Sequence, residues 1–169
     1  MHRACAALAV MALLAIARTA AAESPSADLE LLTRARAAIS DVRAFERLNE
    51  DIVRLCREPV TGAYGDWREE FHADLERAHA LAKALQRRLP GDLAEAPGDD
   101  RLKAFTEVEG QALQSRCLRW STLLIQRESP VRADVAARFA LLRDNEARLR
   151  AILANDAAWQ EWRTSGAVH

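Results

Sequence analysis

The stretch from Asp100 to Ser129 constrains the fold more than any other part of the chain. It contains no proline and one internal glycine, Gly110, and its core positions recur at steps of three and four residues, the spacing of one helix face. These positions are Leu102, Phe105, Glu109, Leu113, Arg116/Cys117, Trp120 and Leu123/Leu124. One helix over 102–128 would be roughly 40 Å long at about 1.5 Å per residue. Because such a helix is not stable alone in water, other helices must cover its apolar face.

Prolines divide the rest of the chain into further helical runs. They stand between the runs, at Pro25, Pro59, Pro90, Pro97 and Pro130. The apolar spacing predicts a first helix over 26–57, a second over 66–89 and a fourth from Pro130 to about Asn155, followed by a short last turn with two tryptophans. We therefore predict an all-α fold, an up-down-up-down four-helix bundle with antiparallel neighbours.

Two segments between these runs are expected to be irregular. Residues 58–66 contain Pro59, Gly62 and Gly65 and are predicted to form a loop that carries the single tyrosine, Tyr64. Residues 91–99 contain Pro97 and a neighbouring glycine and are predicted to form a flexible linker.

The N-terminal residues have the pattern of a secretory signal peptide. Arg3 precedes an almost unbroken apolar run over 4–17, and alanines at 20–22 provide the small residues of a cleavage site. The apolar run is shorter than the ~20 residues that span a bilayer, and no second one follows. We expect cleavage after residue 22, one mature domain over 23–169 without a transmembrane segment, and a periplasmic or secreted location. The Ala-, Arg- and Leu-rich composition further suggests a Gram-negative bacterium.

The mature composition limits the classes of partner. Of the 169 residues, 147 remain after removal of residues 1–22, with 22 basic and 25 acidic side chains and a net charge of −3. This charge gives no general attraction to nucleic acid or anionic lipid. Both methionines lie within residues 1–22, so the mature chain has no thioether ligand, and we expect no cofactor.

Two cysteines, Cys56 and Cys117, remain in the mature chain. In an oxidising compartment a disulfide between them is the default expectation. In a square bundle the first and third helices would be diagonal, yet a disulfide requires Cα atoms roughly 4.4–6.8 Å apart. The bond therefore predicts either an inward bend at the end of the first helix or a neighbouring position for the two helices.

A candidate metal site lies on the second predicted helix. His72, Glu76 and His79 fall on one helix face over two turns, and each histidine follows a glutamate by three residues. Helical Glu-x-x-His units supply ligands in the carboxylate metal sites of bundle cores. However, this group flanks the apolar stripe, and no second such unit occurs on another helix. Solvated histidines on a charged surface are the simpler interpretation.

A candidate anion- or partner-binding site is a row of arginines on the first predicted helix. Arg36, Arg43, Arg47 and Arg54 are separated by seven, four and seven residues, which places them on one side. Such a row could bind a phosphate, a polycarboxylate or an acidic partner. Glu46 and Glu50 border it, so an ion-paired solvated face is the simpler alternative.

These features leave three hypotheses for function. The first is an exported helical binding or interaction protein without catalytic activity, acting on an unknown protein or envelope component. The second is a periplasmic metal-binding bundle that uses the histidine cluster, and the third is a small secreted enzyme with an arginine-lined anion pocket. No activated nucleophile, Cys-x-x-Cys motif or glycine-rich phosphate loop is recognisable, so no catalytic residue is assigned. The pattern leaves the oligomeric state open.

Overall fold

The computed structural model describes residues 25–88 and 100–164, and in these two ranges the chain consists of eight helices without a strand. This confirms the predicted all-α class. The predicted signal peptide over 1–22, the linker over 91–99 and the C-terminal end of the chain lie outside the described residues. In the described ranges no helix is both long and apolar enough to cross a bilayer.

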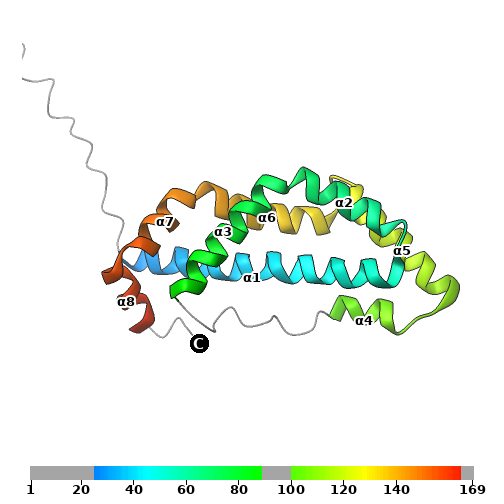
Figure 1. Cartoon of the computed structure of the whole chain (residues 1–169), viewed down its shortest axis with the longest axis horizontal. Helices are drawn as coiled ribbons and strands as arrows, with labels where there is room; N and C mark the ends of the chain where they lie inside the picture. Colours follow the sequence, from blue (N-terminus) through cyan, green and yellow to red (C-terminus); the bar gives the residue numbers. More distant parts are fainter. Residues whose placement is uncertain (1–24, 89–99, 165–169) are drawn as a thin grey trace, which may run out of the picture.

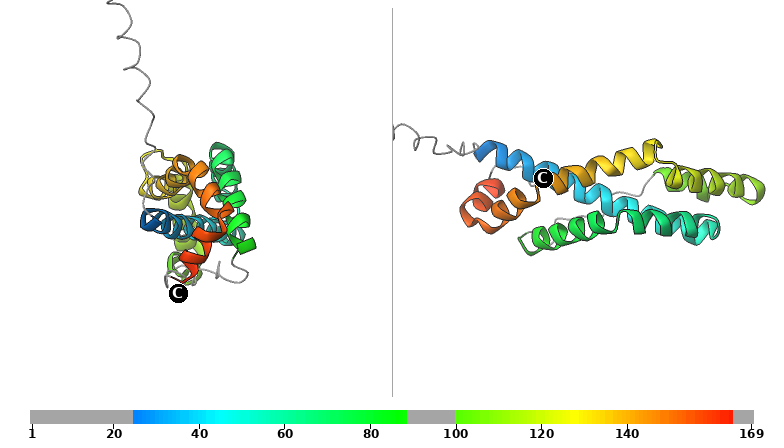
Figure 2. Two further views of the ribbon diagram at one scale, coloured as in Figure 1. Left: turned by 90° about the vertical axis from the view of Figure 1, so that its left-hand side faces the viewer. Right: turned by 90° about the horizontal axis from the view of Figure 1, so that it is seen from above.

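Helix α1 (Pro25–Cys56) runs through the middle of the molecule and contacts all seven other helices (Figure 1). Seen from above, α3 (His72–Arg88) lies on one side of α1, and α5 (Gly110–Ile125) and α6 (Pro130–Asp144) lie on the other (Figure 2). Helix α2 (Val60–Glu70) runs over the C-terminal half of α1 (Figure 1). The short α4 (Asp100–Thr106) lies against the C-terminal half of α1. Helices α7 (Glu146–Ala154) and α8 (Asp156–Thr164) lie near its N-terminal half.

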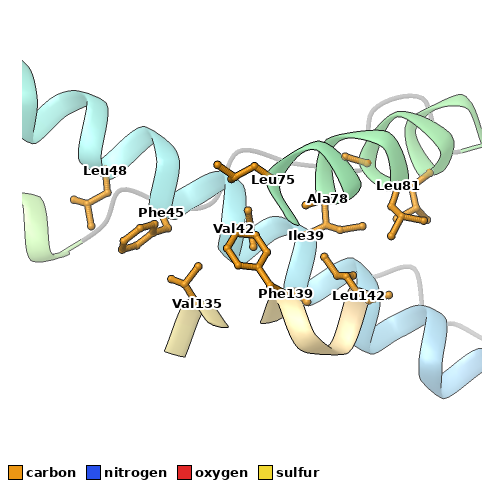
Figure 3. Close-up of a cluster of buried hydrophobic side chains, with 14 of the residues drawn as sticks. Ile39, Val42, Phe45, Leu48, Leu75, Ala78, Leu81, Val135, Phe139 and Leu142 are labelled. Atoms are coloured by element: carbon orange, nitrogen blue, oxygen red, sulfur yellow. The ribbon is translucent and has the colours of Figure 1, made fainter. Parts of the chain in front are cut away.

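The central part of the core is built from α1, α3 and α6 (Figure 3). Each helix contributes apolar side chains at steps of three or four residues, so each turns one continuous face inward. The contributing residues are Ile39, Val42, Phe45 and Leu48 from α1, Leu75, Ala78 and Leu81 from α3, and Val135, Phe139 and Leu142 from α6. Each of the larger side chains stabilises the fold by about 1.5–3 kcal/mol on burial. Trp120, which the sequence also predicted to face inward, is buried, and so is Leu85 of α3.

The predicted loop over 58–66 is wrong, because most of it is helical. Helix α2 begins at Val60, and its buried residues Val60, Ala63, Tyr64 and Trp67 have helical spacing. Its two glycines lie on the exposed side of this helix, where they need not break it. Helix α2 ends at Glu70, and Phe71, with a φ of −98° and a ψ of 15°, lies between it and α3. Tyr64 is therefore a core residue of α2 and does not lie in a loop.

The single long helix predicted over 102–128 is also wrong, because residues 107–109 separate α4 from α5. Gly110 has φ of 57°, a left-handed conformation that glycine adopts without steric cost. Glu109, expected on the buried face, is extended and exposed. The break allows α4 to pack on α1 while α5 packs mainly against α2.

The fourth predicted helix is divided at Asn145 into α6 and α7, and again at Asn155, where the sequence predicted an interruption. The Asn155 carboxamide accepts a hydrogen bond from the backbone N–H of Ala157 at 3.0 Å, which favours the start of α8. Trp159 and Trp162 in α8 are both buried. They are part of the core.

The predicted disulfide between Cys56 and Cys117 is confirmed, with an S–S distance of 2.00 Å and a Cα–Cα distance of 5.6 Å. It joins the C-terminal residue of α1 to the middle of α5. Both α4 and α5 contact α1, so the first and third predicted helical regions are neighbours. Of the two arrangements that the bond required, the structure has this one.

Candidate functional site

A surface cleft with a volume of about 670 Å³ lies between α1, α2 and α3. Nine residues line it: Arg43, Glu46, Arg47 and Glu50 from α1, Arg68 from α2, and His79, Ala82, Lys83 and Gln86 from α3. On both long helices the lining residues follow the steps three, one and three, which places them on one face of each helix. Two helix faces that lie side by side therefore form the two walls.

The apolar core fixes which faces of α1 and α3 line the cleft. Phe45 and Leu48 are buried on α1 next to the lining residues of that helix, and Ala78 and Leu81 have the same position on α3. Their burial sets the rotation of each helix about its axis, so the polar flank of each apolar stripe turns toward the other. Ala82 is the buried lining residue of α3 and contributes no side chain long enough to fill the cleft.

The lining carries more positive than negative charge. Four lining residues are cationic, Arg43, Arg47, Arg68 and Lys83, whereas two, Glu46 and Glu50, are acidic. In the described part of the chain, Arg43, Arg47 and Lys83 form no ion pair, and the Arg68 guanidinium lies over the Tyr64 ring, 5.9 Å from its centroid. Like charges on neighbouring helix faces raise the local potential and attract an anion.

One of the two carboxylates is already engaged. Glu46 Oε2 lies 2.7 Å from His79 Nε2, and the Glu46 side chain is only 13% exposed. The Tyr64 hydroxyl donates to the Glu46 main-chain oxygen at 3.5 Å. Burial raises the pKa of Tyr64 above its ordinary value of 10.0, and the negative charge of Glu46 raises it further, against the opposing effect of Arg68. Glu46 therefore links α1 to both neighbouring helices, and the two carboxylates of the lining remain outnumbered by its four cationic side chains.

The structure brings together two of the four arginines that the sequence singled out. Arg43 and Arg47 line the cleft, whereas Arg36 does not. Arg54 lies on the surface, where its guanidinium is 2.7 Å from Asp51. Arg54 therefore pairs with an acidic residue three positions before it on α1.

The three candidate metal ligands do not converge. His72 and Glu76 are exposed on α3, and His79 contacts Glu46 across the cleft. Within residues 25–88 and 100–164, no group of three or more His, Cys, Asp or Glu side chains is placed to hold a metal ion.

Sequence reasoning missed Arg68 and Lys83 as members of the site. Lys83 follows His79 by four residues on the same flank of the apolar stripe, which is a readable signal once the two helices are known to be neighbours. Arg68 lies within the second predicted helix, over 66–89, but was not singled out, and the break at Phe71 places it on α2, apart from Lys83 on α3. Its position became clear only from the contact between its guanidinium and Tyr64.

The chemistry available in the cleft is recognition of negative charge. Guanidinium groups bind carboxylates and phosphates through paired N–H donors, and an ammonium group adds a further charge. No family model matches this chain, and no curated protein or solved structure is significantly similar to it. A function must therefore be inferred from the geometry of the cleft.

Proposed function

We propose that this chain is an exported binding protein that holds a small polyanion, a polycarboxylate or a phosphate ester, in the cleft between α1, α2 and α3. The observation that carries the proposal is the group of Arg43, Arg47 and Lys83, three cationic side chains on facing helices without an ion pair among the described residues. Arg43 and Arg47 are partly buried, which strengthens their attraction for an anion relative to fully solvated side chains. The volume of about 670 Å³ is in the range of small-molecule sites.

Export to the periplasm of a Gram-negative bacterium, after cleavage of residues 1–22, is part of this proposal. The N-terminal sequence pattern and the Cys56–Cys117 disulfide both support it, because such bonds persist in oxidising compartments. The mature domain would be a modified four-helix bundle in which α2–α3, α4–α5 and α6–α7 form the second, third and fourth rods around α1. The ligand would then be a component of the cell envelope or its surroundings.

Calorimetric titration of the mature chain, residues 23–169, with citrate and with pyrophosphate tests the proposal and separates carboxylate from phosphate recognition. The double variant R43Q/R47Q removes two charges from the cleft, and R54Q/R127Q removes two exposed arginines outside its lining. We expect binding of at least one anion to weaken about tenfold or more in R43Q/R47Q and to stay within about twofold in the control. No heat with either anion, or equal loss in both variants, would exclude the cleft as the site.

A further inference from the structure

A second cleft, with a volume of about 470 Å³, is lined by residues of α4 and α5. These two helices lie near one end of the molecule (Figure 1). Its lining combines apolar and cationic side chains and, among the described residues that form it, contains no acidic residue. The first cleft is different, because two carboxylates and two further polar side chains interrupt its cationic lining. The two clefts therefore favour different ligand chemistry.

The base of the second cleft is hydrocarbon. Phe105 of α4 meets Trp120 of α5 edge to face, with ring centroids 5.9 Å apart. The indole N–H of Trp120 donates to Asn49 Oδ1 at 2.9 Å, so the polar atom of this side chain is used inside the core. Ala104 and Leu123 line the same cleft and are partly exposed. A ligand that covered them would remove apolar surface from water.

The rim of the second cleft is cationic. Arg101 lies on α4, and Arg116 and Arg119 lie three residues apart on α5, on adjoining turns of one face. Arg116 and Arg119 are exposed and have no ion pair in the described ranges. Elsewhere in the same ranges arginines on α3, α6 and α7 commonly pair with carboxylates, as Arg138 does with Asp134 at 2.7 Å. Two guanidinium groups next to an apolar surface leave a positive field that a carboxylate would neutralise.

We propose that the α4–α5 cleft binds a monomeric amphiphilic carboxylate, such as a medium-chain fatty acid. Its carboxylate contacts Arg116 and Arg119, and its acyl chain covers Ala104, Leu123 and the edge of Phe105. Charge alone is insufficient in this site, because four of its seven lining residues offer only van der Waals contact. This binding is independent of the polyanion proposed for the first cleft.

The test is a titration of the isotope-labelled mature protein with decanoate below its micelle concentration, followed by NMR of the Trp120 indole N–H and the arginine Nε–H groups. Acetate carries the same charge without the chain, and decanol carries the chain without the charge. We expect decanoate to shift the Trp120, Arg116 and Arg119 signals and to bind about tenfold or more tightly than acetate, because each buried methylene adds affinity. Decanol should bind more weakly than decanoate by a similar factor.

Matched variants separate this site from the first cleft. R116Q/R119Q should weaken decanoate binding about tenfold or more, whereas R43Q/R47Q and R54Q/R127Q should leave it unchanged. Circular dichroism of each variant verifies folding before titration. Equal affinity for acetate and decanoate, equal affinity for decanol and decanoate, or absence of a shift at Trp120 would each overturn the proposal. None of these results bears on polyanion binding by Arg43 and Arg47.

Discussion

The hydrogen bond between Trp120 and Asn49 joins α5 to α1 inside the core, and its removal gives a quantitative prediction. The Asn49 side chain is fully buried, accepts from Trp120 Nε1 at 2.9 Å and donates to the Phe45 main-chain oxygen at 2.7 Å. Replacing Asn49 by leucine keeps a side chain of similar size and removes the acceptor. Trp120, itself buried, would then keep an N–H group without a partner.

The cost follows from which groups lose their partners. A buried donor left unsatisfied costs about 1–3 kcal/mol. The Phe45 carbonyl loses less, because it still accepts the backbone N–H of residue 49 within α1. We therefore expect Asn49→Leu to lower the free energy of unfolding by about 2 kcal/mol. For a domain of this size, that corresponds to a fall in Tm of roughly 4–8 °C.

A double-mutant cycle with Trp120→Phe isolates this contact, since phenylalanine has no N–H group to leave unsatisfied. Urea unfolding followed by circular dichroism gives the four stabilities under oxidising conditions. In the Phe background, Asn49→Leu should be nearly neutral, so that the two substitutions couple by about 1 kcal/mol or more. The same loss in both backgrounds would refute the reasoning, because the cost would then come from packing and not from the hydrogen bond.

Three further predictions concern other parts of the fold. Reducing the Cys56–Cys117 bond, which spans 61 residues, should lower the free energy of unfolding by about 4 kcal/mol in the chain-entropy estimate, and an unchanged urea midpoint on reduction would contradict this. Tyr64, the single tyrosine, should ionise only above its ordinary pKa of 10.0, because burial opposes the tyrosinate. Its contribution to the free energy of unfolding is complete below pH 10.0 and falls as the pH rises above that value. Ultraviolet absorbance should therefore show no tyrosine titration near pH 10 in the folded protein. Arg132→Ala should lower the free energy of unfolding by about 2 kcal/mol, because the Arg132 guanidinium donates to the Leu124 carbonyl at 2.8 Å near the end of α5. Thermal unfolding measures this change, and a decrease below about 0.5 kcal/mol would count against that contact.

Features governed by local periodicity could be predicted from the sequence. The first helix, expected over 26–57, is found over Pro25–Cys56, and the inward position predicted for Trp120 is confirmed. The disulfide followed from cysteine arithmetic, since only two cysteines remain after residues 1–22. These predictions succeeded because each depends on the residue types along one helix or on the number of cysteines in the mature chain.

The helix breaks could not be predicted, because tertiary contacts decide them. Gly62 and Gly65 suggested a loop, yet α2 forms because Val60, Tyr64 and Trp67 find a buried environment. In contrast, the run through Gly110 looked continuous, but α4 and α5 pack on different partners and the chain must turn between them. A glycine marks only where the backbone is free to turn; packing determines whether it does.

Only part of the candidate site could be predicted, because the rest also depends on tertiary contacts. Arg43 and Arg47 were singled out because they share one face of one helix. Arg68 and Lys83 come from α2 and α3, and their place beside the arginines depends on how three helices meet. Arg54 belongs to the same row of arginines in the sequence, but it pairs with Asp51 outside the cleft lining.

Side-chain NMR of the mature protein during titration with pyrophosphate tests the central claim, that the cleft between α1, α2 and α3 receives an anion. The Nε–H signals of Arg43, Arg47 and Arg68 should shift together and saturate with a single dissociation constant. The signal of Arg54, which lies outside the cleft lining, should stay in place. Equal small shifts at all four arginines, or saturable shifts only at Arg54, would contradict the assignment of binding to this cleft.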